Sequence, residues 1–364
     1  MVNPKGELTV EEERDWPDTH HSKQKPRLIL DIGAGIDSAF ALVYALLSPR
    51  VRLEGILATS NGAYSARQAA DNALRLIRLC EPGYEIPVAI GAESAMPLPG
   101  DGVDERGSRE GRVASAHEER GSGGVPGDDG RQGLGDALLA PSDQAPEPLP
   151  AAPFLARAAK ARPGELTLVL AGRASNWPAA LALEPATRAR FREIVAAGGT
   201  VLAPGDATPV AETSFRGDPQ AAAALFRTAA QLTAVGLDAA RRALLAAADL
   251  ALAAEMSREP RKLRAAELLR RLHAYRARRL LATGCPLGCI PLHATLGVLA
   301  AEESGLFAFQ TWRARVESGG GLAAGMVVAD RRDPPSDASG NPIRFAMDLD
   351  GPRAIKRFLS VFVD

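Results

Sequence analysis

Cysteine is scarce in this chain of 364 residues, which contains three. Three cysteines do not make a disulfide framework in a chain of this length, and they are consistent with a reducing cytoplasm. Cys285 and Cys289 stand four positions apart with no second pair elsewhere, which disfavours a zinc site. We therefore expect a cytoplasmic protein in which both are small buried side chains.

Strong net charge and long apolar runs are also lacking. The formal net charge is -1, which offers no general attraction to a phosphate backbone, so nucleic acid is not an expected partner. Apolar stretches such as residues 40–47 and 243–254 are interrupted or too short for a bilayer, which needs roughly 20 apolar residues. We expect no membrane span. Residues 1–25 have no apolar core and are expected to be a flexible tail rather than a secretory signal.

The sequence from residue 26 onward alternates between strand and helix patterns. Short apolar runs bounded by turn residues alternate with stretches of helical character, which favours a mostly parallel sheet with helices on both faces. The first expected strands are residues 27–31, 51–59 and 86–90, and the first expected helices are residues 38–47 and 66–80. We therefore predict a doubly wound α/β fold in a single domain over residues 26–364.

Residues 99–150 interrupt this pattern, because they are dense in Gly, Pro and charged residues and contain few large apolar ones. A surface insertion or partly disordered loop is expected there. After it, we expect strands at residues 166–171, 312–316, 326–328 and 343–347. We expect helical structure at residues 177–183, 186–193, 218–229 and 352–358, and helix in several pieces over residues 237–281. The helix at 218–229 is expected to be capped by Asp218 ahead of Pro219.

The first strand runs into the turn Asp31-Ile32-Gly33-Ala34-Gly35-Ile36-Asp37-Ser38. Its glycine spacing comes near the dinucleotide fingerprint G-x-G-x-x-G. That site also needs an acid at the carboxyl end of the second strand, to hold the ribose hydroxyls. The second strand instead ends in Thr59-Ser60-Asn61, which disfavours the dinucleotide interpretation.

Further short motifs follow the turn in a fixed order. Residues 168–183 read L-V-L-A-G-R-A-S-N-W-P-A-A-L-A-L, and the other motifs are residues 55–61 (G-I-L-A-T-S-N), 86–92 (I-P-V-A-I-G-A), 198–199 (G-G), 208–212 (T-P-V-A-E), 218–222 (D-P-Q-A-A) and 291–293 (P-L-H). Over nearly all of residues 26–364 they resemble the inosine-uridine nucleoside hydrolase family. In that family the first strand ends in D-x-D-P-G-x-D-D, and the motif at 168–183 reads L-V-A-x-G-P-L-T-N-L-A-x-A-L.

The resemblance implies a calcium site that this sequence has lost. In the family, three carboxylates and a backbone carbonyl hold calcium, and one of the carboxylates is also the base for the attacking water. The matching positions here are Gly33, Ser38, Ala294 and the carbonyl of Ser175. Calcium needs six to eight oxygens and charged ligands. We therefore expect no calcium and no other cofactor, and family-type catalysis should be absent or very weak.

The resemblance also implies that part of a ribose pocket is retained. Asn61 and Glu212 match residues that hold ribose hydroxyls, and His293 matches a histidine near the leaving base. Asp206 replaces an Asn. The expected ligand-binding residues are Asp31, Asp37, Asn61, Ser175, Asn176, Asp206, Glu212 and His293.

Simpler roles remain open for these residues. Asp31 or Asp37 would also suit a helix cap, Glu212 an ordinary loop acid, and His293 a buried core group.

Three functions stay open from the sequence. The first is a non-catalytic relative that binds a nucleoside, another ribosyl ligand or a protein. The second is a calcium-independent N-ribosyl hydrolase, in which Asp31, Asp37 or Asp206 is the base and His293 protonates the leaving base. The third is a regulatory or structural subunit that pairs with an active homologue. Since the family commonly forms dimers and tetramers, we expect a homo-oligomer or a hetero-oligomer with such a homologue.

Overall fold

The computed structural model describes residues 25–97, 129–282, 288–336 and 340–363. Within these residues one nine-stranded sheet has the order β10-β9-β11-β6-β5-β4-β1-β2-β3. Strands from β11 to β3 run parallel, whereas β9 and β10 are antiparallel at one edge. The strands of this sheet are β1 (Arg27–Ile32), β2 (Arg52–Ala58), β3 (Val88–Ile90), β4 (Leu166–Ala171), β5 (Glu193–Ala197), β6 (Leu232–Val235), β9 (Phe307–Val316), β10 (Val327–Asp330) and β11 (Asn341–Leu349).

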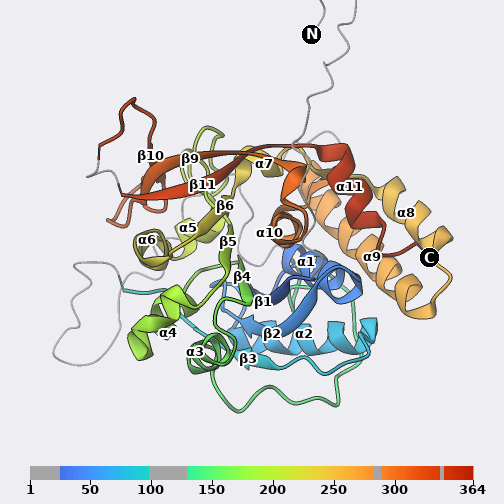
Figure 1. Cartoon of the computed structure of the whole chain (residues 1–364). Helices are drawn as coiled ribbons and strands as arrows, with labels where there is room; N and C mark the ends of the chain where they lie inside the picture. Colours follow the sequence, from blue (N-terminus) through green and yellow to red (C-terminus); the bar gives the residue numbers. More distant parts are fainter. Residues whose placement is uncertain (1–24, 98–128, 283–287, 337–339, 364) are drawn as a thin grey trace, which may run out of the picture.

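Helices cover both faces of this sheet (Figure 1). On one face lie α3, α4 and α6, and on the other lie α1, α2 and α10, with α9 packed across α1 and α2. The helices are α1 (Ile36–Leu47), α2 (Ala66–Cys80), α3 (Ala151–Ala161), α4 (Asn176–Leu183), α5 (Thr213–Gly217), α6 (Pro219–Thr228), α7 (Leu237–Ala240), α8 (Ala247–Met256), α9 (Pro260–Ala282), α10 (His293–Glu302) and α11 (Gly351–Leu359). The expected mostly parallel, doubly wound α/β fold is confirmed.

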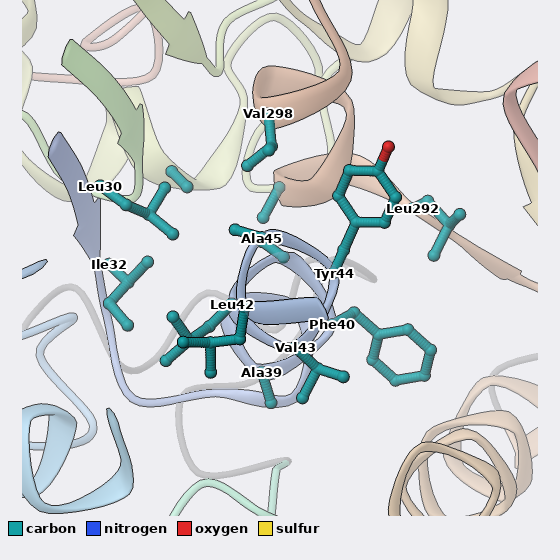
Figure 2. Packing of buried hydrophobic residues seen from close by; sticks show 14 of the residues in the cluster. Leu30, Ile32, Ala39, Phe40, Leu42, Val43, Tyr44, Ala45, Leu292 and Val298 are labelled. Carbon is teal, nitrogen blue, oxygen red and sulfur yellow. The ribbon is translucent and has the colours of Figure 1, made fainter. Parts of the chain in front are cut away.

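Helix α1 is the centre of one core layer because it is apolar on nearly every side. Figure 2 shows Phe40 and Tyr44 projecting from α1, with Leu30 of β1 and Val298 of α10 nearby. Phe40 and Tyr44 each stack on Phe358, at centroid distances of 5.9 and 5.8 Å. Burying one such aromatic side chain contributes roughly 2–3 kcal/mol. This packing fixes the position of the turn that precedes α1.

The strands in the centre of the sheet have buried residues on both faces, as parallel strands covered by helices do. Every residue of β4 is buried, and β4 lies between β1 and β5. Trp177 of α4 and Phe226 of α6 fill the second core layer, on the face opposite α1. The two layers hold the carboxyl ends of β1 and β4 side by side.

Most expected elements are found with small changes in their ends. The predicted bounds of residues 66–80 and 166–171 are those of α2 and β4. Asp218 caps α6 as expected, since its Oδ1 accepts a hydrogen bond from the Ala221 N–H at 3.0 Å.

Three features of the structure were not expected from the sequence. Residues 186–193 are not an α-helix: a short 3-10 helix spans Pro185–Ala189, and β5 begins at Glu193. Strand β6 was not predicted, because its four residues resemble the end of a helical stretch. Residues 237–281 form helix in several pieces as expected, namely α7, α8 and α9, but the short strand β7 (Leu244–Leu245) within this range, which pairs with β8 (Ile290–Pro291), was not predicted.

Some expectations fall wholly or partly outside the described residues. These are the flexible tail at residues 1–25, most of the first part of the 99–150 insertion, and Cys285. Cys289 is partly exposed rather than buried, whereas Cys80 is fully buried in α2. Among the described helices, none is both long and apolar enough to cross a membrane.

Candidate functional site

The carboxyl ends of the parallel strands form the edge of the sheet where the predicted site residues gather. The chain places β1, β2 and β3 outward in one direction and β4, β5 and β6 outward in the other. Open α/β sheets bind ligands in the crevice where the strand order reverses, which here lies between β1 and β4. A methyl group at Gly172, after β4, would lie 3.3 Å from the backbone nitrogen of Gly33, after β1. Two glycines therefore let these loops meet at the candidate site.

Asp31 lies at the end of β1 and is fully buried among polar groups. Its carboxylate accepts hydrogen bonds from the Thr59 hydroxyl at 2.5 Å and the Asn176 side-chain amide at 3.0 Å. Asn176 also donates to Thr59 Oγ1 at 2.7 Å and accepts from the Ala92 N–H at 3.0 Å. Burial raises the pKa of Asp31 from 3.8 to about 7, although both hydrogen bonds lower it. Asp31 and Asn176 thus form an internal polar junction, and Asp31 does not cap α1.

Asp37 lies in the first turn of α1 and reaches helix α10. Its Oδ2 accepts a hydrogen bond from the Ala294 N–H at 2.9 Å, so Asp37 caps α10 rather than its own helix. Burial raises the pKa of Asp37, and the charge of nearby His293 is the strongest opposing effect. His293, the first residue of α10, is partly exposed, and its buried Nε2 has no hydrogen-bond partner among the described groups.

Glu212 is also within reach of the charge of His293, and it is buried. Its carboxylate accepts backbone N–H groups of Gly199 at 2.9 Å and Ser214 at 2.8 Å, and it caps α5. Burial raises the pKa of Glu212, His293 lowers it, and Asp206 raises it further. Asp206 itself accepts the Thr213 N–H at 2.8 Å. The charge of His293 therefore acts on two carboxylates, Asp37 and Glu212, and each of them also accepts a backbone N–H at a helix end.

Asn61 and Ser175 bind groups of the protein itself. The Asn61 amide donates to the Ala34 carbonyl at 3.0 Å, and its oxygen accepts the Tyr64 N–H at 2.9 Å. The Ser175 hydroxyl donates to Asp218 at 2.6 Å. These bonds shape the loops after β2 and β4. Both residues thus have defined structural roles in addition to any contact with a ligand.

A carboxylate that the sequence did not point to, Asp129, reaches the glycine turn from within the 99–150 insertion. Its Oδ2 accepts the Ile36 N–H at 3.2 Å, which caps α1, and its Oδ1 pairs with Arg276 of α9 at 2.6 Å. A methyl group at Gly35 would lie 2.9 Å from Asp129 Oδ2. The charges of both Asp129 and Arg276 act on Asp37.

The segment from 129 to 139 holds this carboxylate in place by packing against α2 and α9. Leu134 is 3% exposed and belongs to the main core. The Asn72 amide donates to the Gln132 carbonyl at 2.7 Å, and the Tyr64 hydroxyl donates to the Gly130 carbonyl at 2.5 Å. Gly135 has a φ of 56°, which favours glycine, and a Cβ there would approach Cγ of the Tyr275 ring to 3.0 Å. This end of the insertion is part of the fold, although its glycine content predicted a surface loop.

The pair between Asp129 and Arg276 should stabilise the fold measurably. In a double-mutant cycle of Asp129→Ala and Arg276→Ala, we expect a coupling free energy of about 1–2 kcal/mol from urea unfolding, since the pair is partly buried and charge-assisted. The matched control is Arg78 and Asp143, whose side chains are 46% and 98% exposed and whose coupling should be near zero. Equal coupling in the two cycles would contradict a special role for Asp129.

Arg173 is a second group that sequence comparison did not single out. It follows Gly172 at the end of β4, where the related motif has Pro in G-P-L-T-N. Its guanidinium lies beside Gly62 and Gly217, and burial lowers its pKa, against the opposing effect of Asp218. The substitution of Pro by Arg inside a matched motif was a signal in the sequence that this position had changed.

Comparison with known proteins places this site in a family. The family model described as inosine-uridine preferring nucleoside hydrolase matches residues 28–356. The chain belongs to this family.

Relatives in the nucleoside hydrolase family include plant and bacterial proteins. The chain is 32% identical to uridine nucleosidase 1 of Arabidopsis thaliana over 225 residues, which are 62% of this chain and 60% of that protein. It is 30% identical to the non-specific ribonucleoside hydrolase RihC of Escherichia coli O6:H1 over 330 residues, which are 89% of this chain and 93% of that protein. The solved structure of the plant nucleoside hydrolase PpNRh1 shares the fold, with a TM-score of 0.78 and 24% identity over 93% of this chain and 99% of that one.

The nucleoside hydrolase fold brings only some of the predicted site residues together. The charge of His293 acts on both Asp37 and Glu212, and the charge of Asp206 acts on Glu212. Asp31, Asn176 and Ser175 are buried, and their side chains bind protein groups. At the three positions matching the family's metal carboxylates, Gly33 is partly exposed and Ser38 and Ala294 are buried. Gly33 and Ser38 border a cavity of about 10 Å³, enough for one water at most.

Proposed function

We propose that this chain binds a nucleoside or related ribosyl ligand around Asp37 and His293 without a calcium ion of the family type. The observation that carries the proposal is His293, whose buried Nε2 has no partner among the described groups and whose charge acts on both Asp37 and Glu212. An unsatisfied buried nitrogen costs free energy unless a ligand or water binds it. A ribosyl hydroxyl or the heteroatom of a base suits this position, because either one can accept or donate a hydrogen bond.

The side chains at the edge of the sheet do not fit a calcium ion. Gly33 and Ala294 supply no side-chain oxygen, and Ser38 supplies one neutral hydroxyl. In the described ranges, no three His, Cys, Asp or Glu side chains are grouped to hold a metal. One oxygen of Asp37 accepts a hydrogen bond from the N–H of Ala294, the residue that stands where the family has a third metal carboxylate. Calcium affinity depends on charged oxygen ligands, so we propose that the chain binds its ribosyl ligand independently of calcium.

Titration calorimetry with uridine and inosine tests this proposal. We expect the same affinity in EDTA and in millimolar calcium. Asp37→Asn and His293→Ala should each weaken binding roughly tenfold or more, the cost of losing a hydrogen bond to a charged or buried group. Asp71→Asn is the control, because Asp71 lies on α2 and its side chain is 42% exposed. Binding that disappears in EDTA would contradict the calcium-free site, and no binding of either nucleoside would overturn the ribosyl proposal.

A second candidate function is calcium-independent hydrolysis of the N-ribosyl bond. It is favoured by the neighbouring Asp37 and His293, which could act as base and acid. Water would attack the anomeric carbon while Asp37 takes a proton from that water. The bond between this carbon and the base would break, its electron pair would go to the base nitrogen, and His293 would protonate that nitrogen. Asp31 suits the base role less well, because it is fully buried and both of its oxygens accept hydrogen bonds, whereas Asp206 stays an alternative base.

An activity assay in EDTA distinguishes a hydrolase from a protein that only binds the riboside. Nitrophenol release from nitrophenyl riboside should be measured for the parent chain, Asp37→Asn and His293→Ala. Asp37 must be ionised to act as the base, and burial raises its pKa. A rate that depends on Asp37 should therefore rise with pH in the acidic range, as the ionised fraction of Asp37 increases. Nucleoside binding with no release above background leaves the binding function alone, while release that both variants abolish supports the hydrolase.

A further inference from the structure

Arg173 places a positive charge at the reversal of strand order. It follows Gly172, and Gly172 is in contact with the backbone of Gly33 across the crevice between β4 and β1. The side chain is partly exposed rather than sealed in the core. A cation at this place stands where α/β sheets bind their ligands.

Two glycines form a slot for the Arg173 side chain. A methyl group at Gly62 would lie 2.6 Å from Arg173 Nη2, and one at Gly217 would lie 2.6 Å from Nε. Gly62 follows β2 and Gly217 ends α5, so the guanidinium spans loops from both sides of the crevice. Such a slot fixes the direction of a long side chain and reduces the entropy that binding would cost.

The charge of Arg173 has no close anionic partner in the described part of the chain. No carboxylate there lies within 4.0 Å of it. Asp218 is the acid whose charge acts on it, but the Asp218 carboxylate accepts the Ser175 hydroxyl and the N–H groups of Met96 and Ala221. Burial of a cation without a paired anion is costly, and here it outweighs Asp218 and lowers the pKa of Arg173. An anionic ligand would offset this cost.

The neighbouring glycine turn has also lost negative charge relative to the related motif. Gly33 stands where the related motif has a carboxylate, and Arg173 stands where it has a proline. One change removes a negative charge from the crevice and the other adds a positive charge across from it. We propose that Arg173 binds the phosphate of a phosphorylated riboside, such as a nucleoside monophosphate. The planar guanidinium can donate two parallel hydrogen bonds to phosphate oxygens.

This inference rests on the proposed ribosyl site and is tested beside it by titration calorimetry. The probes are uridine, uridine 5′-monophosphate, ribose 5-phosphate and inorganic phosphate. We expect the parent chain to bind the monophosphate roughly 10- to 100-fold more tightly than uridine. Arg173→Ala should remove that preference and change uridine affinity less than about threefold. The preference should also weaken with added salt, because the contact is between charges.

Two further variants separate position from charge. Gly217→Ala retains the positive charge but displaces Nε, so it should reduce the preference for the monophosphate as Arg173→Ala does. Arg188→Ala removes an exposed arginine from the short helix after α4 and should keep the full preference. Circular dichroism and thermal unfolding confirm that each variant is folded.

The outcomes distinguish this inference from the proposed function. Equal binding of uridine and its monophosphate by the parent chain would overturn the role of Arg173 and leave the ribosyl site intact. A preference that survives in Arg173→Ala would overturn it as well. Binding of inorganic phosphate alone, with the same affinity as the monophosphate, would show a phosphate site that does not recognise the riboside. If none of the four probes binds, both proposals fail.

Discussion

Calcium is expected to leave the thermal unfolding of the parent chain unchanged and to stabilise a variant in which three carboxylates are restored. This variant combines Gly33→Asp, Ser38→Asp and Ala294→Asp. A Cβ at Gly33 would meet the Asn61 Cβ at 3.5 Å and the Thr59 carbonyl oxygen at 3.7 Å, which are ordinary contacts, so the first side-chain atom of an aspartate is accommodated there. Calcium at a hundred times its dissociation constant should stabilise the variant by about 2.7 kcal/mol.

Matched controls make this test specific. The double variant Ser38→Asp with Ala294→Asp lacks the carboxylate nearest β4, and it should respond to calcium much less than the triple variant. Magnesium should have a smaller effect than calcium, because it requires stricter geometry and keeps its waters. If burial of the new carboxylates prevents folding, Gly33→Asp alone is compared with the parent. A calcium-dependent rise in the melting temperature of the parent would contradict the proposed calcium-free site.

Asp31→Asn is expected to flatten the dependence of stability on pH. In the folded chain burial raises the pKa of Asp31 from 3.8 to about 7. Between these values the unfolded state releases the proton while the folded state keeps it, so stability falls as pH rises. The full effect is on the order of 4 kcal/mol, present below the lower pKa and lost by about pH 7.

Urea unfolding between about pH 4 and pH 8 measures this effect. The Asp31→Asn variant should lose less unfolding free energy across that range than the parent, whatever its absolute stability. Asp143→Asn is the control, since the Asp143 side chain is 98% exposed, and its slope should match the parent. Parallel slopes for the parent and Asp31→Asn would show that Asp31 does not retain its proton in the folded state.

Helices and strands could be predicted from the sequence where the pattern of their own apolar residues was sufficient to determine the conformation. Helix α2 has a regular apolar face and a serine cap, and β4 is a continuous apolar run bounded by polar residues and glycine. Strand β6 was missed because four residues do not distinguish a strand from the end of a helix. Its partners β5 and β11, which are distant in sequence, determine its conformation.

The candidate site was only partly predictable, for a different physical reason. Matched motifs predicted Asp37, Glu212 and His293 as site residues, and in the structure the charge of His293 acts on both acids. The motifs did not show that Asp37 caps α10 or that Glu212 binds the Gly199 N–H. Such partners are backbone groups, which carry no sequence signal of their own.

Asp129 is the clearest case of a group that sequence reasoning could not find. It ends a stretch rich in glycine and charge, where alignment to relatives gives no guidance. Its importance comes from two contacts, 93 residues back to Ile36 and 147 residues forward to Arg276. Composition alone therefore cannot separate an aspartate that caps a core helix from one that is merely solvated.

The buried junction of Asp31, Thr59 and Asn176 also bears on the order in which the chain assembles. Asn176 joins partners 84, 117 and 145 residues earlier in the sequence. Contacts over such separations form late, because closing a long loop costs entropy. A chain emerging from the ribosome as far as β3 already has the apolar neighbours of β1 on one side, but Asp31 still lacks its amide donor. The polar groups at the carboxyl ends of the strands therefore have all their hydrogen-bond partners only after β4 has joined the sheet and Asn176 has reached Asp31 and Thr59.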